Sequence, residues 1–211
     1  MKVLVVCARR YNGHELWTAL GVMQEKGIDF EVVSTSLTIC DERTLRPNIL
    51  ARTVYQVTKE EAQKFDGLMI VSGNMDDTEA YWHDEHVQNL VIWFNEDNRA
   101  IAAICCSAPT VAPVAKDKKV SFYPLVRSRQ RLQQFGALLQ TTTISVDHNL
   151  VTAEHQMATQ MWTEEFVHML KDEPPEHIFH DSGFVPRGRP RRMPIEIEEM
   201  INKAIRDDKK K

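Results

Sequence analysis

Two adjacent cysteines, Cys105 and Cys106, lie where a run of small and branched apolar residues ends, in the segment AAICCSAPT. A strand that turns sharply into a helix can hold one side chain above a sheet, with backbone N–H groups converging beside it. The helix N-terminus stabilises a thiolate in that position and lowers the cysteine pKa below its free value of ~8.5. The segment therefore predicts a cysteine nucleophile. The alternative is that both cysteines are small buried hydrophobic residues.

The residues around the cysteines resemble the ThiJ/PfpI superfamily of intracellular protease I-like and deglycase-like proteins, whose elbow reads Ala-Ile-Cys-x-Gly-Pro. Here the run Cys106-Ser107-Ala108-Pro109 is similar to Cys-x-Gly-Pro, with Ala108 in place of glycine. The spacing to Pro109 selects Cys106 as the nucleophile. Cys105 then takes the apolar strand position of the motif, where we expect it to pack within the sheet.

Two further segments resemble the family in the same order. Glu15, in GHELW at the start of an expected helix, matches the family's glutamate that contacts the nucleophile. A protonated carboxyl there can hydrogen-bond a thiolate and later donate a proton; its alternative role is only to favour the helix dipole. In LMIVSGN, Gly73 matches the second glycine of a loop that supplies an oxyanion N–H, and Ser72 replaces the first. The resemblance, which covers residues 1 to about 170, implies that the N–H groups of Gly73 and Ser107 stabilise an oxyanion.

The histidine found in many members of this family has no direct counterpart. Where the family carries it beside the cysteine or in a later His-Pro segment, this chain has Ser107 and Tyr123. A tyrosine, with a pKa near ~10, can hydrogen-bond a substrate but is a poor base at neutral pH. His155 and His14 are the candidate replacements, and an ordinary surface or turn histidine is the alternative for each. Glu154 stands where the family often brings an anion-binding arginine, which indicates a different substrate preference.

The resemblance implies glyoxalase, deglycase, peptidase or amidase-like chemistry on a small-molecule carbonyl, glycated, peptide or amide substrate. In this scheme Cys106 attacks, the N–H groups of Gly73 and Ser107 hold the oxyanion and Glu15 manages the proton, with no metal or organic cofactor required. The alternative is a non-enzymatic oxidative-stress sensor or chaperone-like protein whose Cys106 is oxidised to a sulfinate. The family also implies a homodimer or a larger homo-oligomer.

Strand and helix patterns alternate along the chain, as the positioning of such a site requires. They predict an α/β fold with a doubly wound, mainly parallel sheet and helices on both faces, a flavodoxin-like three-layer sandwich. Expected strands are residues 2–6, 29–34, 68–71, 100–105 and 119–122, with a β ribbon over 141–153 that turns at 147–149. Expected helices are residues 15–27, a short helix capped by Thr58 and Glu61, an amphipathic helix from 84, and helices over 128–134 and 159–170.

Composition and charge limit the possible partners. The 211 residues carry a formal net charge of −4 and a pI near 6.1, which gives no overall electrostatic bias toward nucleic acid or a membrane. No apolar run approaches the ~18 residues that span a bilayer, and the opening MKVLVVCARR is typical of a first strand rather than a signal peptide. We therefore expect a cytoplasmic protein. Its four cysteines show no CxxC or Cys/His spacing, which disfavours structural zinc and disulfides.

Pro174 and Pro175 mark an expected boundary, beyond which apolar content drops and turn residues crowd together. They divide the chain into a ThiJ/PfpI-like α/β domain over residues 1–171 and a C-terminal extension over residues 172–211. Helical spacing returns near the end of the extension, between 197 and 205. That apolar stripe needs either the parent domain or a second subunit to bury it.

The extension also contains the basic segment VPRGRPRRMP. Its PRGRP core resembles an AT-hook, in which Arg187 and Arg189 enter a narrow A·T-rich minor groove. The alternative is a proline-constrained arm that wraps a neighbouring subunit, and the acidic charge of the whole chain favours this second interpretation. The sequence thus leaves nucleic acid as a possible partner of the extension alone.

Overall fold

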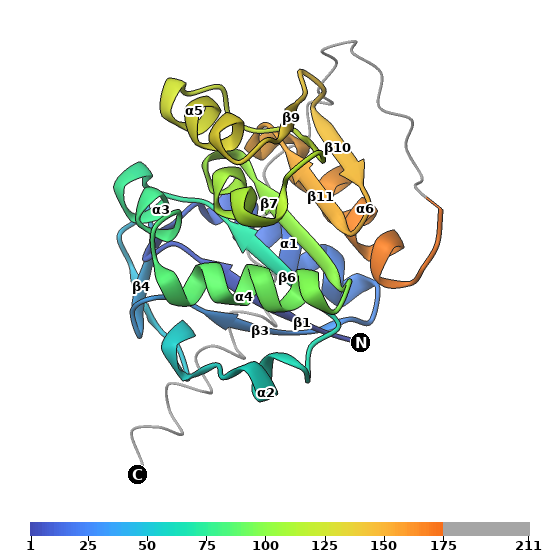
Figure 1. The fold of residues 1–211 in the computed structure, drawn as a ribbon. Coiled ribbons are helices and arrows are strands. Elements are labelled where there is room, and N and C mark those ends of the chain that lie inside the picture. Colours follow the sequence, from blue (N-terminus) through green and yellow to red (C-terminus); the bar gives the residue numbers. More distant parts are fainter. Residues whose placement is uncertain (175–211) are drawn as a thin grey trace, which may run out of the picture.

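A computed structural model describes residues 1–174, and the rest of the chain lies outside the described residues. These residues form a six-stranded sheet between two layers of helices (Figure 1). The strand order is β10-β11-β7-β6-β1-β3, and every neighbouring pair is parallel except β10 with β11. The predicted doubly wound, mainly parallel sheet is confirmed. The strands are β1 Lys2–Cys7, β3 Asp29–Val33, β6 Gly67–Val71, β7 Ala100–Ile104, β10 Ile144–Asp147 and β11 Leu150–Ala153.

Successive residues of each strand enter opposite layers of the sandwich. On β1, Leu4 belongs to the core beneath α4, whereas Val5 belongs to the core beneath α1 and α6. In Figure 1, α4 crosses in front of the sheet, and α1 and α6 lie side by side behind it. Because both faces are covered, β6 and β7 are buried along their whole length, as their continuous apolar sequences require. These helices are α1 Gly13–Glu25, α4 Glu85–Glu96 and α6 Thr159–Leu170.

Helices begin and end close to the positions that the sequence predicts. The carboxylate of Asp84 caps α4, and α6 covers the predicted range. α1 ends before Gly27, whose φ of 69° is a left-handed conformation that glycine adopts without strain. Thr58 caps the short helix α2 (Lys59–Ala62), and the predicted ribbon is the antiparallel pair β10 and β11.

Several short elements are absent from the sequence prediction. The expected strand over 119–122 contributes only two residues, and it pairs outside the main sheet. Strands of two to four residues are too short for an alternating pattern to distinguish them from loops. The additional elements are β2 Arg10–Tyr11, β4 Thr38–Asp41 and β5 Pro47–Ile49 in one small sheet, β9 Leu138–Leu139, which pairs with β8 Lys119–Val120 in another, and helix α3 Met75–Tyr81. The predicted helix over 128–134 is present as α5 Val126–Gln134.

The carboxyl ends of the parallel strands lie along one edge of the sheet. β1 lies between β3 and β6. After β1 the chain adds β3 on one side of it, and the later strand β6 is added on the other side. In doubly wound folds this reversal of strand order forms a crevice in which ligands bind. The segments that follow β1, β6, β7 and β11 carry Glu15, Ser72, Cys105 and His155, respectively. The fold therefore gathers the candidate residues at this edge.

The last described helix, α6, ends at Leu170, close to the predicted boundary between domain and extension. Residues 175–211 lie outside the described residues, and with them Arg187, Arg189 and the apolar stripe over 197–205. The AT-hook, the subunit-wrapping arm and the boundary itself stay predictions. Within residues 1–174, no helix combines the length and apolar character that crossing a bilayer requires.

Candidate active site

The two cysteines occupy a sharp strand-to-helix turn. β7 ends at Ile104, and a 3₁₀ helix over Cys105–Val114 begins at the next residue. Cys105 has a φ of 58°, in the left-handed region that costs a residue with a Cβ roughly 1–2 kcal/mol. The strand therefore ends one residue earlier than expected, and Cys105 lies at the turn, where it still packs against the core beneath α1 and α6. Cys105 is half-buried at the turn, whereas Cys106 is only 9% exposed.

Hydrogen bonds to neighbouring elements fix this turn. The buried Ser107 hydroxyl lies 2.8 Å from the carbonyl oxygen of Ile70 on β6, and it accepts a hydrogen bond from the Ile104 N–H at 3.1 Å. The indole N–H of Trp82 donates to the Cys106 carbonyl oxygen at 3.0 Å. The Ser107 side chain thus joins β7 to β6, a role that the sequence does not predict. The oxyanion role of the Ser107 N–H stays a prediction.

The sulfur atoms of Cys105 and Cys106 are hydrogen-bonded to each other, with 3.8 Å between the two Sγ atoms. The hydrogen bond from Cys105 lowers the pKa of Cys106, and the positive charge of Arg127 acts in the same direction, against burial and the charge of Glu15. The same sulfur–sulfur bond, together with burial, raises the pKa of Cys105. A proton held between the two sulfurs thus makes one thiolate easier to form than in a lone buried cysteine.

Glu15 is fully buried in the first turn of α1 and faces the end of β6. Its carboxyl group accepts hydrogen bonds from the Ser72 backbone N–H at 2.7 Å and from the Ser72 hydroxyl at 2.8 Å. Burial raises the pKa of Glu15 well above its ordinary value, the nearby Cys105 adds to this, and the Ser72 hydrogen bonds oppose it. The environment therefore favours the neutral, protonated carboxyl that the sequence analysis requires.

Asn12 is a site residue that the sequence analysis does not identify. The Asn12 side chain caps α1 by accepting hydrogen bonds from the His14 and Glu15 N–H groups at 3.0 and 3.2 Å. Its backbone N–H donates to the Ser72 carbonyl oxygen at 2.9 Å, and its side-chain amide donates to Gln156 at 2.6 Å. An asparagine just before GHELW is a recognisable N-cap signal, whereas nothing in the sequence indicates its contact with Gln156.

The Gly73 loop lies against the segment that follows β1. The Gly73 N–H donates to the buried Thr78 hydroxyl at 3.0 Å, so the expected oxyanion donor is already paired within the chain. Its oxyanion role stays a prediction that requires this hydrogen bond to open. Gly73 forms a bridge with Tyr11, and a Cβ atom at Gly73 would lie only 2.6 Å from the Tyr11 Cα. Only glycine fits this approach of two backbones.

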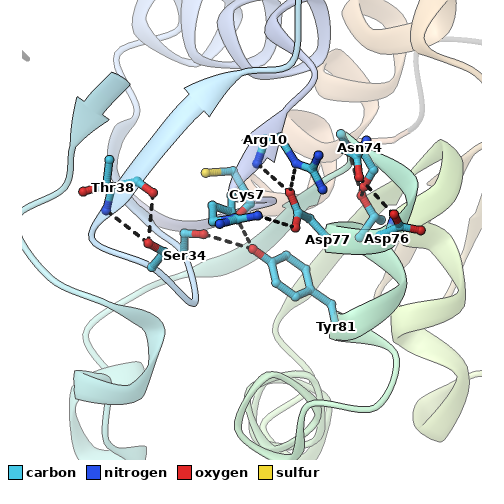
Figure 2. A network of polar contacts seen from close by, with 12 residues as sticks. Cys7, Arg10, Ser34, Thr38, Asn74, Asp76, Asp77 and Tyr81 are labelled. Carbon is cyan, nitrogen blue, oxygen red and sulfur yellow. Dashed lines mark hydrogen bonds and ion pairs between the residues drawn. The ribbon is translucent and has the colours of Figure 1, made fainter. Parts of the chain in front are cut away.

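A polar network holds the same two loops together from the side of α3 (Figure 2). Arg10 donates from its Nε to the Asp77 carboxylate at 2.6 Å, and its backbone N–H donates to the same carboxylate at 3.2 Å. The Tyr81 hydroxyl reaches the carbonyl oxygen of Cys7 and the hydroxyl of Ser34, at 3.0 Å from the latter. The end of β1 is therefore fixed, and with it the start of α1, which carries Glu15.

The candidate auxiliary residues lie near one another. The Tyr123 N–H contacts the Cys105 carbonyl oxygen at 3.4 Å, and the Tyr123 ring is tilted against the His155 ring, with 6.3 Å between centroids. His155 accepts a hydrogen bond from the Met157 N–H through its Nδ1, which places the hydrogen of a neutral ring on Nε2. The pKa of His14 is lowered by burial and by the charge of Arg43, with a smaller contribution from His155. A proton-transfer role for these residues stays a prediction.

Arg127 is the cation that the sequence analysis overlooks. It pairs with Glu79 at 2.6 Å and helps to lower the pKa of Cys106. Its position at the start of a predicted polar helix gives no sign of a functional role. Among residues 1–174, no three histidine, cysteine or acidic side chains are grouped so that they could hold a metal ion.

Glu15 should give the protein a distinctive pH dependence of stability. Because the pKa of Glu15 is raised in the folded chain, the folded protein keeps a proton that the unfolded chain releases above its ordinary pKa of 4.5. The free energy of unfolding should fall as the pH rises from there toward the folded pKa, by up to about 1.4 kcal/mol per pH unit. Glu15→Gln, which cannot ionise, should remove this slope in urea unfolding. An equal slope in both proteins would contradict the assignment.

Comparisons with known proteins agree with this architecture. The sequence profile of the DJ-1/PfpI family matches residues 1–169. An uncharacterised protein of Methanocaldococcus jannaschii is 28% identical over 156 residues, which cover 72% of this chain and 74% of that protein. The fold is similar to a ThiJ/PfpI domain protein from Brachyspira murdochii, with a TM-score of 0.70, 17% identity and coverage of 82% and 98%. It is also similar to DJ-1beta of Drosophila melanogaster, with a TM-score of 0.67, 20% identity and coverage of 81% and 94%.

Proposed function

The chain belongs to the DJ-1/PfpI family, and from this membership and the geometry of the turn we propose that it is a cysteine-dependent enzyme that acts on an electrophilic carbonyl group. The observation that carries the proposal is the half-buried cysteine held in a left-handed conformation at the end of β7. Non-glycine residues held in such conformations concentrate at active sites, where the surrounding structure offsets their strain. The substrate classes are those expected from the sequence: small carbonyl compounds, glycated groups, peptides and amides.

We assign the attacking sulfur to Cys105 and revise the sequence-based choice of Cys106. Two observations favour Cys105: its left-handed backbone and the larger exposed fraction of the residue. The buried Glu15 carboxyl interacts electrostatically with both cysteines and does not distinguish them. The lowered pKa of Cys106 favours the original choice. Since the two sulfurs share a hydrogen bond, however, its proton can be held by either one, and a thiolate on Cys105 with the proton on Cys106 uses the same contact.

In the proposed reaction the Cys105 thiolate adds to the carbonyl carbon. A sulfur–carbon bond forms, and the carbonyl π electrons move to oxygen. The neutral Glu15 carboxyl supplies the proton to this oxygen and becomes a carboxylate, which Ser72 stabilises through its N–H and hydroxyl. That carboxylate can then remove a proton from the adduct. Glu15 thus acts first as an acid and then as a base.

The remaining sequence-based expectations belong to the same proposal. The protein is expected in the cytoplasm as a homodimer or larger homo-oligomer, and the chemistry needs neither a metal nor an organic cofactor. The stress-sensor alternative is favoured by one specific observation, the direct contact between two free sulfurs.

A substrate panel tests the proposal. Purified full-length protein is incubated with methylglyoxal, a glycated amine, a peptide and a small amide, and product formation is followed by chromatography. We expect turnover of at least one class by the wild-type protein and a loss of roughly 10²-fold or more for Glu15→Gln, which keeps the size of the neutral carboxyl but has no acidic proton to transfer. An absence of cysteine-dependent turnover across the panel would overturn the enzyme assignment.

A further inference from the structure

We propose that Cys105 and Cys106 form a dithiol that hydroperoxides convert into a reversible disulfide between the two adjacent residues. The observation that carries this is the direct sulfur–sulfur contact of 3.8 Å between two free cysteines at a partly buried turn. The other two cysteines lie on other elements, Cys7 at the end of β1 and Cys40 on β4. The dithiol is therefore a property of the turn itself.

The chemistry needs a hydroperoxide as oxidant and proceeds in two balanced steps. In the first, a thiolate attacks the peroxide: a sulfur–oxygen bond forms, the oxygen–oxygen bond breaks, and an alcohol leaves after taking up a proton, so that a sulfenic acid remains. In the second, the neighbouring sulfur attacks the sulfenic acid: the disulfide forms and water leaves. In total, two thiols lose two electrons and two protons, and one hydroperoxide becomes an alcohol and a water molecule.

The surroundings of the pair suit both steps. The hydrogen bond from Cys105 and the charge of Arg127 favour a thiolate on Cys106, while Glu15 and Glu42 oppose it. Burial raises the pKa of Glu15, which favours its neutral form and limits its opposition. The second sulfur is already in contact with the first. It can therefore attack a sulfenic acid before another peroxide molecule arrives, and this protects the site from irreversible oxidation.

Closing the pair requires the sulfurs to approach from 3.8 Å to a bond length of about 2.05 Å. Rotations of the two side chains can supply this movement, but the backbone cannot relax fully. The Cα atoms of consecutive residues across a trans peptide are about 3.8 Å apart, below the usual disulfide range of about 4.4–6.8 Å. The resulting bond should be strained and easily reduced, as expected of a regulatory disulfide rather than a structural one.

Mass spectrometry tests the inference directly. Cleavage after Arg99 and Lys116 releases one peptide that contains both Cys105 and Cys106 and no other cysteine. After the full-length protein is treated with about one equivalent of hydrogen peroxide and then alkylated, we expect this peptide about 2 Da lighter than its reduced form and unalkylated. Dithiothreitol should restore two alkylation sites. A peptide about 32 Da heavier, with no lighter species, would overturn the inference in favour of a sulfinate.

Matched variants complete the experiment. Cys105→Ser and Cys106→Ser should each abolish the lighter species, whereas the double variant Cys7→Ser plus Cys40→Ser should keep it. A lighter species lost only in the double variant would overturn the assignment to the adjacent pair.

The effect of this disulfide on activity rests on the proposed function. Oxidised protein should lose at least ten-fold in turnover and regain it with dithiothreitol. The two proposals fail separately, because the mass measurement does not depend on turnover. If the disulfide forms in a protein that shows no turnover, the dithiol proposal stands and the enzyme proposal fails. If turnover is found and no disulfide forms, the enzyme proposal stands and the dithiol proposal fails.

Discussion

Cys105→Ser is expected to lower kcat/KM by about 10³-fold or more, whereas Cys106→Ser should lower it only about ten-fold. A serine hydroxyl is not ionised at neutral pH, so the first variant has no nucleophile. The second variant keeps the nucleophile and loses the sulfur–sulfur hydrogen bond, in which a proton held on Cys106 would stabilise a Cys105 thiolate. Serine has a Cβ like cysteine, so Cys105→Ser keeps the same left-handed strain and should fold normally.

The same pair of variants can be compared without a substrate. The rate of alkylation by iodoacetamide, measured as a function of pH, reports the thiolate at each remaining cysteine. We expect fast alkylation to survive in Cys106→Ser and to disappear in Cys105→Ser. The opposite pattern, with Cys106 as the residue needed for alkylation and turnover, would restore the choice made from the sequence motif.

Gly73→Ala is expected to lower the free energy of unfolding by about 3 kcal/mol, or the melting temperature by roughly 6–12 °C. An added Cβ would lie 2.6 Å from the Tyr11 Cα and closer still to the Arg10 carbonyl oxygen. Both obstacles are backbone atoms, so no side-chain rotation can relieve the contact. Because the loops of β1 and β6 must separate to accept the methyl group, cysteine alkylation should slow as well.

Gly27→Ala is the matched control for this substitution. Gly27 has a left-handed φ of 69°, and no atom lies within 4 Å of an added Cβ. Alanine at this position therefore has a strained backbone but no steric clash. We expect a loss of about 1–2 kcal/mol and unchanged alkylation. Thermal unfolding of the two variants separates the causes. Equal losses in both would show that the close approach of the two loops contributes little.

The sequence predicts the layers of this fold better than the details of the site. The apolar residues of α4 repeat over two turns, and the continuous apolar runs of β6 and β7 are typical of strands covered on both faces, so these elements could be placed. The small sheet of β2, β4 and β5 could not, because its strands hold two to four residues each. Periodicity needs more residues than that to be recognised.

The choice between the cysteines shows a different limit. The motif compares residue types at fixed spacing to Pro109, whereas the position of the turn is decided by where β7 stops pairing and by the torsion angle at Cys105. The two criteria differ by one residue. The motif therefore selects Cys106 as the nucleophile, whereas the backbone conformation favours its neighbour Cys105. The contact between Ser72 and Glu15 could not be predicted either, because it joins residues that are distant in the chain.

The hydrogen bond between Asn12 and Gln156 links an early segment of the chain to one that the ribosome makes more than a hundred residues later. Proteins synthesised from the N-terminus expose their early segments before the later ones exist. The cysteines therefore emerge before the last strand and helix can close around them. A growing chain therefore carries the two sulfurs before the contact between Asn12 and Gln156 can form.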